Sequence, residues 1–281
     1  MSEELEGKHG VQSLEIGMGI LRAMVRGQRA MMLKDIAAAA GMAPSKAHRY
    51  LVSLIRAGLV EQDPLTSRYD LGPFALNIGL VAIDRIDRIR LGLTAIAELR
   101  DRINETTALG IWSERGPVIV RWERPRRPIT VNVVTGAQLH LLNSAAGRVF
   151  AAWMPKMRMA PLIAEEIRTL KLPEKLRSKN GVEAMLARVR ADGFAAIDDG
   201  YFAEGVEAVA APVFNFKGEI SIALVVVGVR GTTDMTPDGN VVSELRRAAG
   251  ALSERLGCSG NCAKVGAGET ATETEAPTLA P

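Results

Sequence analysis

The sequence predicts an α+β chain with a small winged helix-turn-helix domain, a linker helix and a larger mixed α/β domain. Residues 33–71 follow the order helix, glycine turn, helix, hairpin, which is the outline of a winged helix-turn-helix. Beyond residue 105, short strand-like segments alternate with helical ones. A chain of 281 residues with 47% hydrophobic side chains is long enough for about two domains. We place the segments at 10–72, 73–88, 89–259 and 260–281.

Local signals define the first domain. The first helix of the pair ends at Gly41, and the second ends at Gly58, a residue that commonly stops helices. The hairpin at 59–71 turns at a run of Asp, Pro, Thr and Ser. A preceding helix at 11–27 is expected to pack behind the pair, with Ser13 as its N-cap.

The second helix of the pair has one apolar face and one basic face. At 100° per residue, the outward face carries cations and no carboxylate. Cations neutralise phosphates, while hydroxyl and imidazole groups can reach base edges. Taken by themselves, the charges fit an ordinary solvent-exposed helix face. The turn and the hairpin beside this helix favour DNA binding instead. The predicted DNA-binding residues are Ser45, Lys46, His48, Arg49, Ser53 and, at the hairpin, Arg68, which could equally be a solvated strand-end arginine.

Residues 73–105 predict one long helix or two consecutive ones, with a polar junction at 84–88. Such a segment connects or dimerises domains, or it begins the core of the second domain. An apolar stripe of Ile89, Leu93, Ile96 and Leu99 predicts a homodimer or a homotetramer.

The second domain is predicted to hold a mixed, largely antiparallel sheet with helices packed on it. The residues after 260 contain hardly any large apolar groups and are expected to stay unordered. The expected strands are 108–112, 118–122, 129–134, 194–197, 206–214 and 219–227, and the expected helices are 144–153, 159–170, 182–191 and 238–256.

Composition excludes several classes of protein. The polar N-terminus predicts no signal peptide, and the longest apolar run, 222–229, is too short to span a bilayer. We therefore expect a cytoplasmic protein without a membrane partner. Cys258 and Cys262 lack the two further ligands of a zinc site, so we expect unpaired thiols and no metal.

Catalytic motifs are missing as well. His140 and Ser144 lie four residues apart, but there is no Gly-x-Ser-x-Gly elbow, no His-Glu-x-x-His and no glycine-rich phosphate loop. The sequence predicts neither an enzyme nor a cofactor. An enzymatic second domain is the weaker alternative, and a ligand-independent architectural or repressor DNA-binding dimer is another.

Several segments together resemble the IclR-type transcriptional regulators, named for the isocitrate lyase regulator. The similarity runs from about Val11 to Gly257 in the order of that family. The segments that carry it are Val11–Glu15, Pro44–Leu51, Tyr69–Gly72, Leu139–Arg148, Asp192–Ala195 and Gly205–Val213.

The resemblance implies an oligomer that binds double-stranded operator DNA and holds a small organic acid in a GAF-like C-terminal domain. It places the acid against the backbone amides of Ala145 and Ala146, with Asp198 before the central strand. Leu141 and Leu142 correspond to the apolar cap of the pocket. The carboxylate is expected at the start of this helix, where the dipole favours an anion.

This sequence departs from the family at three pocket positions. Ala208 stands where the family often has cysteine, and Val225 and Val227 match positions that offer hydroxyls in some members. The loss of these donors favours a larger, more apolar and possibly aromatic carboxylate over a two- or three-carbon oxoacid.

Structural roles compete with these assignments. Ala145 and Ala146 could merely allow close packing, and Asp198 begins a good turn sequence. The basic segment Arg121–Arg127 is more often a solvated loop than an anion site, although arginine suits carboxylate capture.

Overall fold

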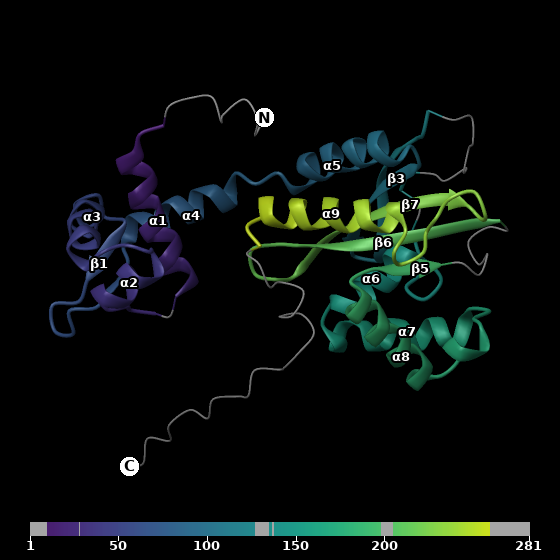
Figure 1. Ribbon diagram of the computed structural model, residues 1–281. Helices are drawn as coiled ribbons and strands as arrows, with labels where there is room; N and C mark the ends of the chain where they lie inside the picture. The colour runs from purple at the N-terminus through teal and green to yellow at the C-terminus, as the bar shows by residue number, and fades with distance from the viewer. Residues whose placement is uncertain (1–9, 28, 127–134, 137, 198–204, 259–281) are drawn as a thin grey trace, which may run out of the picture. The chain divides into compact units, whose positions relative to one another are not determined.

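The computed structural model describes residues 10–27, 29–126, 135–136, 138–197 and 205–258. The chain forms two compact units, residues 1–86 and 87–281, and each is described by itself. Figure 1 labels their helices and strands. The predicted strand at 129–134 and the predicted tail at 260–281 lie outside the described residues.

The first unit is the predicted winged helix-turn-helix. Its buried core joins all three helices to the hairpin through Ile20, Ile36, Leu51 and Tyr69. The elements are α1 (Gln12–Arg26), α2 (Leu33–Ala39), α3 (Pro44–Arg56), the antiparallel pair β1 (Val60–Gln62) and β2 (Tyr69–Leu71), and α4 (Pro73–Asp84).

Helix α1 differs from its prediction in two respects. Ser13 is not its N-cap, because the helix begins at Gln12 after Val11 and no side chain caps it. The buried face runs through Ile20, Leu21 and Met24, so Leu14 and other apolar residues of the helix stay exposed.

The segment at 73–105 breaks into two helices at the predicted junction. Helix α5 (Arg88–Ile103) begins after Asp87, whose carboxylate accepts the N–H of Arg90 at 2.9 Å. The predicted oligomer stripe on α5 is partly wrong, because Ile96 and Leu99 are fully buried in their own domain. Helix α4 instead buries none of its side chains in the first unit, and its large apolar residues are exposed: Phe74, Leu76, Ile78, Leu80, Val81 and Ile83.

The second unit is built on a five-stranded antiparallel sheet in the order β4-β3-β7-β6-β5. The predicted hairpins are confirmed, with turns at Ser113–Gly116 and around Asn215–Gly218. The strands are β3 (Thr106–Ser113), β4 (Gly116–Glu123), β5 (Ala195–Ile197), β6 (Val206–Phe214) and β7 (Ile220–Val229).

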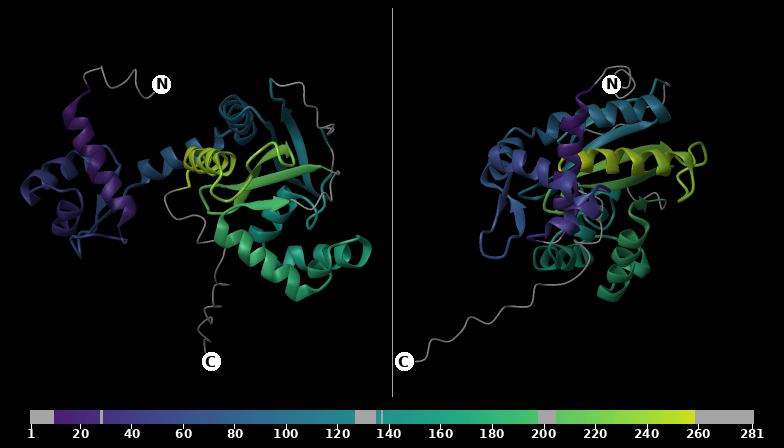
Figure 2. Two further views of the ribbon diagram at one scale, coloured as in Figure 1. Left: turned by 45° about the vertical axis from the view of Figure 1, so that its right-hand side comes forward. Right: turned by 60° about the vertical axis from the view of Figure 1, so that its left-hand side comes forward.

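Helices cover both faces of this sheet. One face packs against α6 (Ala145–Trp153), with α7 (Lys156–Thr169) and α8 (Lys179–Asp192) beyond it. The other face packs against α5 and α9 (Asn240–Arg255), which lie side by side. Figure 2 shows the two layers on opposite sides of the sheet. A short 3-10 turn, Glu174–Leu176, was not predicted.

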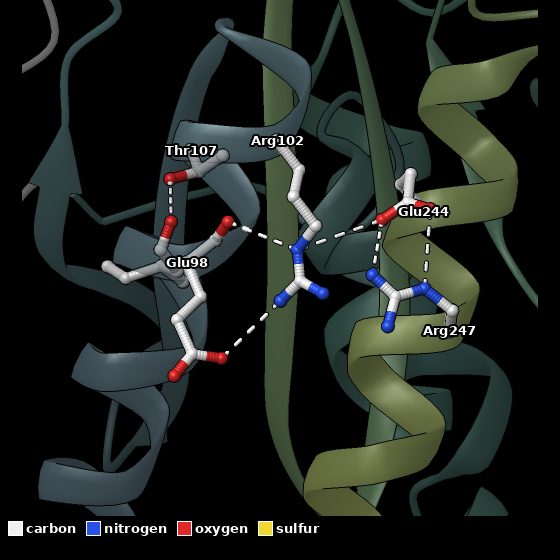
Figure 3. A network of polar contacts seen from close by, with 6 residues as sticks. Glu98, Arg102, Thr107, Glu244 and Arg247 are labelled. Atoms are coloured by element: carbon white, nitrogen blue, oxygen red, sulfur yellow. Dashed lines mark hydrogen bonds and ion pairs between the residues drawn. The ribbon is translucent and has the colours of Figure 1, made fainter. Parts of the chain in front are cut away.

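An ion pair connects the two helices of the α5–α9 layer (Figure 3). Arg102 lies 3.8 Å from Glu244 across the helix pair. Its own helix supplies the carbonyl of Glu98, which accepts the Arg102 Nε hydrogen at 3.3 Å. The pKa of Glu244 is lowered, mainly because Arg247 donates a hydrogen bond to its carboxylate and then through the charges of Arg247 and Arg102.

The structure bears on two further expectations, which concern membrane spans and the cysteines. Within the described ranges, no helix is both long and apolar enough to cross a membrane. Cys258 is in a disulfide bond, so the expectation of an unpaired thiol is wrong for this residue.

Gly92 allows α5 to approach the sheet closely. A Cβ placed on it would lie 2.7 Å from Cδ1 of Leu109 on β3, and the Leu109 side chain is fully buried. Because neighbouring atoms enclose that leucine, it has no free space into which to move. Glycine at this position therefore sets the distance between helix and sheet.

We predict that Gly92→Ala lowers the free energy of unfolding by about 1–3 kcal/mol, because an added methyl group overpacks this contact. Urea denaturation followed by circular dichroism measures the change. Gly250→Ala in α9 is the control, since no atom lies within 4 Å of its Cβ. The control should gain about 0.5–1 kcal/mol from better helix propensity. Equal stability of Gly92→Ala and wild type would contradict the packing argument.

Candidate functional site

The proposed DNA surface lies on α3. The helix buries Ala47, Leu51 and Leu54 against the other helices of the unit. Its opposite face is exposed, which agrees with the sorting of faces made from the sequence. All five DNA-binding residues predicted on this helix are exposed: Ser45, Lys46, His48, Arg49 and Ser53.

The turn between α2 and α3 holds this helix in place. Gly41 adopts φ +66°, a left-handed conformation that suits glycine, and Pro44 occupies the first turn of α3. The N–H of Met42 donates to the carbonyl of Ala37 at 2.9 Å, which closes the turn. Gly41 and Pro44, which indicated the turn in the sequence, therefore shape the turn in the structure.

Local hydrogen bonds order the tip of the wing. The carboxylate of Asp63 accepts the N–H of Leu65 and the hydroxyl of Thr66, both at 2.8 Å. These two bonds, that of Leu65 first, lower the pKa of Asp63. Arg68 is exposed, but its Nη1 donates to the carbonyl of Ala30 at 2.9 Å. The arginine thus ties the wing to the connection between α1 and α2.

In the second unit, the first turn of α6 is tightly packed. Ser144 is the N-cap, and its hydroxyl accepts the N–H of Gly147 at 2.9 Å and donates to the carbonyl of His140 at 2.6 Å. A Cβ on Gly147 would lie 2.0 Å from that carbonyl oxygen. Only glycine fits at this position.

A carboxylate from another helix holds the segment before α6. Glu166 on α7 accepts the N–H of Leu141 at 2.7 Å and that of Leu142 at 2.9 Å. Nδ1 of His140 lies 3.5 Å from the same carboxylate. Arg148 donates to the carbonyls of Leu142 and Ala196, both at 2.8 Å, and so joins this segment to β5.

A cavity of about 40 Å³ lies between the start of α6 and the sheet. The structure brings five predicted effector residues together around it: Ala145, Ala146, Ala208, Val225 and Val227. Leu141 and Leu142 are buried in the adjoining core and do not line it, whereas Leu139 does. Asp198 lies outside the described residues.

The wall of this cavity is almost wholly apolar, with few polar groups. Among the described residues, no acceptor pairs with the backbone N–H of Ala145 or Ala146. Asn143 and Trp122 also line the wall, and neither was predicted there. The Ser144 hydroxyl is already engaged in the cap. The carboxylate of Glu207 lines the wall as well, and it accepts the N–H of Gly231. The N–H groups of Ala145 and Ala146 are the donors here that suit an anion or another acceptor.

A larger cavity of about 460 Å³ adjoins the first and shares Ile197, Glu207 and Ala208 with it. Most of its charged side chains already have partners, with Lys175 the exception among the described residues. Arg188 pairs with Asp192 at 3.3 Å, and Glu207 accepts the N–H of Gly231 at 3.1 Å. We interpret it as a hydrated groove, and the smaller apolar cavity as the candidate ligand site.

Arg121 near the end of β4 and Arg124 just after the strand line a cavity on the surface. Arg121 pairs with Glu123 at 3.1 Å, and Arg126 lies 3.4 Å from Asp101. Arg124 lines the cavity, while Arg127 lies outside the described residues. The ion pairs seen here are those of a solvated basic segment.

Sequence reasoning missed Glu166 and Trp122. Glu166 lies in the middle of an amphipathic helix, where a glutamate normally faces solvent. Trp122 belongs to an apolar strand, where an aromatic residue normally fills the core. Only the fold brings Trp122 to the cavity and Glu166 to the backbone before α6.

Comparison with known proteins identifies both units. Residues 13–64 match the family model of the IclR helix-turn-helix domain, and residues 81–254 match that of the bacterial transcriptional regulator IclR C-terminal domain. The crystal structure of Pseudomonas aeruginosa HmgR is 37% identical, with a TM-score of 0.80, and the match covers 89% of this chain and 100% of that one.

Curated relatives agree with these matches. The glycerol operon regulatory protein of Streptomyces griseus is 32% identical over 88% of this chain and 97% of its own length. The regulator XynR of Escherichia coli is 27% identical over 88% of this chain and 98% of its own length. These relatives are transcriptional regulators and not enzymes. This chain belongs to the IclR family of bacterial transcriptional regulators.

Proposed function

We propose that this protein is a cytoplasmic regulator whose binding to operator DNA is modulated by a small organic acid held beneath α6. The observation that carries the proposal is the cavity at the start of α6. Six alanine and valine side chains from three elements converge there, and two backbone N–H groups have no acceptor from the described residues. A carboxylate at these amides would also gain from the helix dipole.

The apolar wall favours an acid with a carbon body larger than that of a two- or three-carbon oxoacid, and aromatic acids belong to this class. Ala208 and the valines at 225 and 227 offer contact surface and no hydrogen-bond donors. A volume of about 40 Å³ holds only a few water molecules. An acid larger than a two- or three-carbon oxoacid must therefore widen the cavity. Such an acid binds best to a conformation of the domain in which the cavity is already wider.

We further propose a homodimer or a dimer of dimers. Six large apolar residues of α4 are exposed, and Leu14, Met18 and Val25 of α1 and the preceding Val11 are exposed on the same unit. A chain rarely leaves so much apolar surface in water unless a partner covers it. Two copies related by a two-fold axis would place two α3 helices on a near-palindromic operator.

We predict that Arg49→Ala weakens operator binding and lowers the salt dependence of log K by about 0.9 per lost phosphate contact. Arg49 is exposed on the middle of α3 and supports no packing, so the variant should stay folded. Fluorescence anisotropy at several salt concentrations measures the slope. Arg255→Ala in α9 removes an exposed arginine outside the DNA-binding unit and is the control. An unchanged affinity of folded Arg49→Ala would rule out this role.

We predict that Leu80→Glu on α4 shifts the protein towards the monomer and weakens operator binding, because it places a charge in the apolar interface. No side chain of α4 is buried within the unit, so the winged domain should keep its fold. Sedimentation velocity at micromolar concentration gives the oligomeric state. Met157→Glu is the control, since Met157 is an isolated exposed residue of α7. A Leu80→Glu protein with wild-type assembly would exclude α4 from the interface.

We predict that Ala146→Leu abolishes the effect of the acid on DNA affinity and leaves DNA binding itself intact. The added side chain fills a cavity of only about 40 Å³, and the two units have separate cores. Carboxylates that raise the melting temperature of the wild-type protein are used, since a ligand that binds only the folded state stabilises it. Ala160→Leu on the exposed side of α7 is the control. A full acid response in Ala146→Leu would place the ligand elsewhere.

A further inference from the structure

The connection between α1 and α2 is fastened to the wing, which consists of β1, β2 and their turn. Nη1 of Arg68 donates to the carbonyl of Ala30 at 2.9 Å. The next residue, Met31, exchanges two backbone hydrogen bonds with Tyr69 on β2, at 2.9 and 2.8 Å. Arg29 immediately precedes these fastened residues. Its backbone is therefore held beside the wing.

The backbone of Ala30 is strained. Its φ is +49°, in the left-handed region that an alanine rarely adopts. Such a conformation costs free energy and persists only where the surrounding contacts fix it. The bond from Arg68 to the carbonyl of Ala30 is one of these contacts. The wing, and not the local preference of the chain, thus determines where the connection lies.

Arg29 carries a positive charge with which no described residue pairs. The side chain is exposed, and it takes part in no ion pair or hydrogen bond within the described ranges. Arg26 is exposed as well, but it belongs to the last turn of α1, where a cation complements the helix dipole. Arg29 lies beyond the end of that helix, so the dipole gives no reason for its charge.

The wing itself is acidic. Residues 60–71 contain three carboxylates and one arginine. Glu61 and Asp70 are exposed and lie opposite each other in the β1–β2 pair, so one face of the wing repels phosphates. The one arginine, Arg68, directs its Nη1 donor to the backbone of Ala30. The positive charge at this side of the unit that is free to meet DNA therefore comes from the connection.

We propose that Arg29 binds a phosphate of the operator backbone beside the wing, and that Arg68 is a positioning residue that holds the connection in place. A guanidinium suits this task, because it donates two parallel hydrogen bonds to a phosphate. A contact of this kind fixes how the unit lies on the duplex and carries no sequence information. The inference rests on the proposed function, since it concerns the same complex with operator DNA.

The salt dependence of operator affinity tests the contact. The probe is a duplex selected from random sequence by the wild-type protein, and fluorescence anisotropy gives its affinity. We expect Arg29→Ala to lower the slope of log K against log salt by about 0.9 per lost phosphate contact, and Arg29→Lys, which keeps the charge, to retain the wild-type slope. Arg115→Ala is the control, because it removes an exposed arginine from the turn between β3 and β4 in the other unit. A wild-type slope in folded Arg29→Ala would overturn the inference.

A double-mutant cycle separates positioning from contact. If Arg68 acts through Arg29, Arg68→Ala lowers the slope in the wild-type background and leaves it unchanged in the Arg29→Ala background, because the contact is already lost there. If Arg68 binds a phosphate itself, the two losses add. Additive losses would therefore overturn the positioning role of Arg68.

Ethylation interference covers the case in which Arg68→Ala loosens the winged unit. This assay identifies the phosphates that the protein contacts, since ethylation of such a phosphate prevents binding. We expect Arg29→Ala to lose a phosphate contact in each half-site and to keep the contacts made by α3. A wild-type pattern in Arg29→Ala would overturn the inference and leave the proposed function standing. If the wild-type protein selected no duplex, the proposed function would be contradicted, and the inference would fall with it.

Discussion

The first turn of α6 is tightly packed, and this packing fixes the geometry of the cavity beneath it. The carbonyl of His140 occupies the space where a Cβ on Gly147 would lie, and the Ser144 hydroxyl joins both residues. Glu166 then fixes the preceding backbone from α7. With these contacts made, the N–H groups of the first turn point at a fixed place above the sheet. An anion site formed by backbone amides needs this rigidity, because its donors cannot adjust as side chains do.

The DNA-binding unit and the unit that holds the proposed ligand site have separate cores, and this separation limits how a ligand could regulate DNA binding. A ligand beneath α6 changes DNA affinity only if it binds one arrangement of the DNA-binding units better than another. Helices α4 and α5 join the units in sequence, and α4 leaves its apolar residues available to a second copy. If the proposed acid is larger than the cavity of about 40 Å³, it would supply this preference, because it would bind best to a state in which the cavity is wider.

The sequence predicts most of the fold because glycine and proline residues mark the ends of its elements clearly. Gly41, Pro44 and Gly58 mark helix ends for clear steric reasons, and β6 begins and ends where its apolar pattern does. Helix α7 shows where this reasoning fails. It begins three residues before the predicted start at 159, which had placed Pro161 in the first turn, where proline fits best, whereas the structure holds this proline further inside the helix.

The candidate site was predicted less completely than the fold. Resemblance to the family led to Ala146 and the two valines of β7, which do line one cavity. Glu166 and Trp122 could not be found that way, because their contacts join segments far apart in the chain. The same holds for α5, where Ile96 and Leu99 form an apolar stripe that tertiary packing places in the core and not at an interface.

Thermodynamic reciprocity offers the most direct test of the link between the cavity and DNA. One titration measures operator affinity with and without a saturating acid, using a duplex selected from random sequence by the protein. A second titration measures acid affinity with and without that duplex. If the cavity and the DNA surface are coupled, both ratios are equal and differ from one, because the two sites share one coupling free energy. Ratios of one in both titrations, with the acid bound beneath α6, would contradict it.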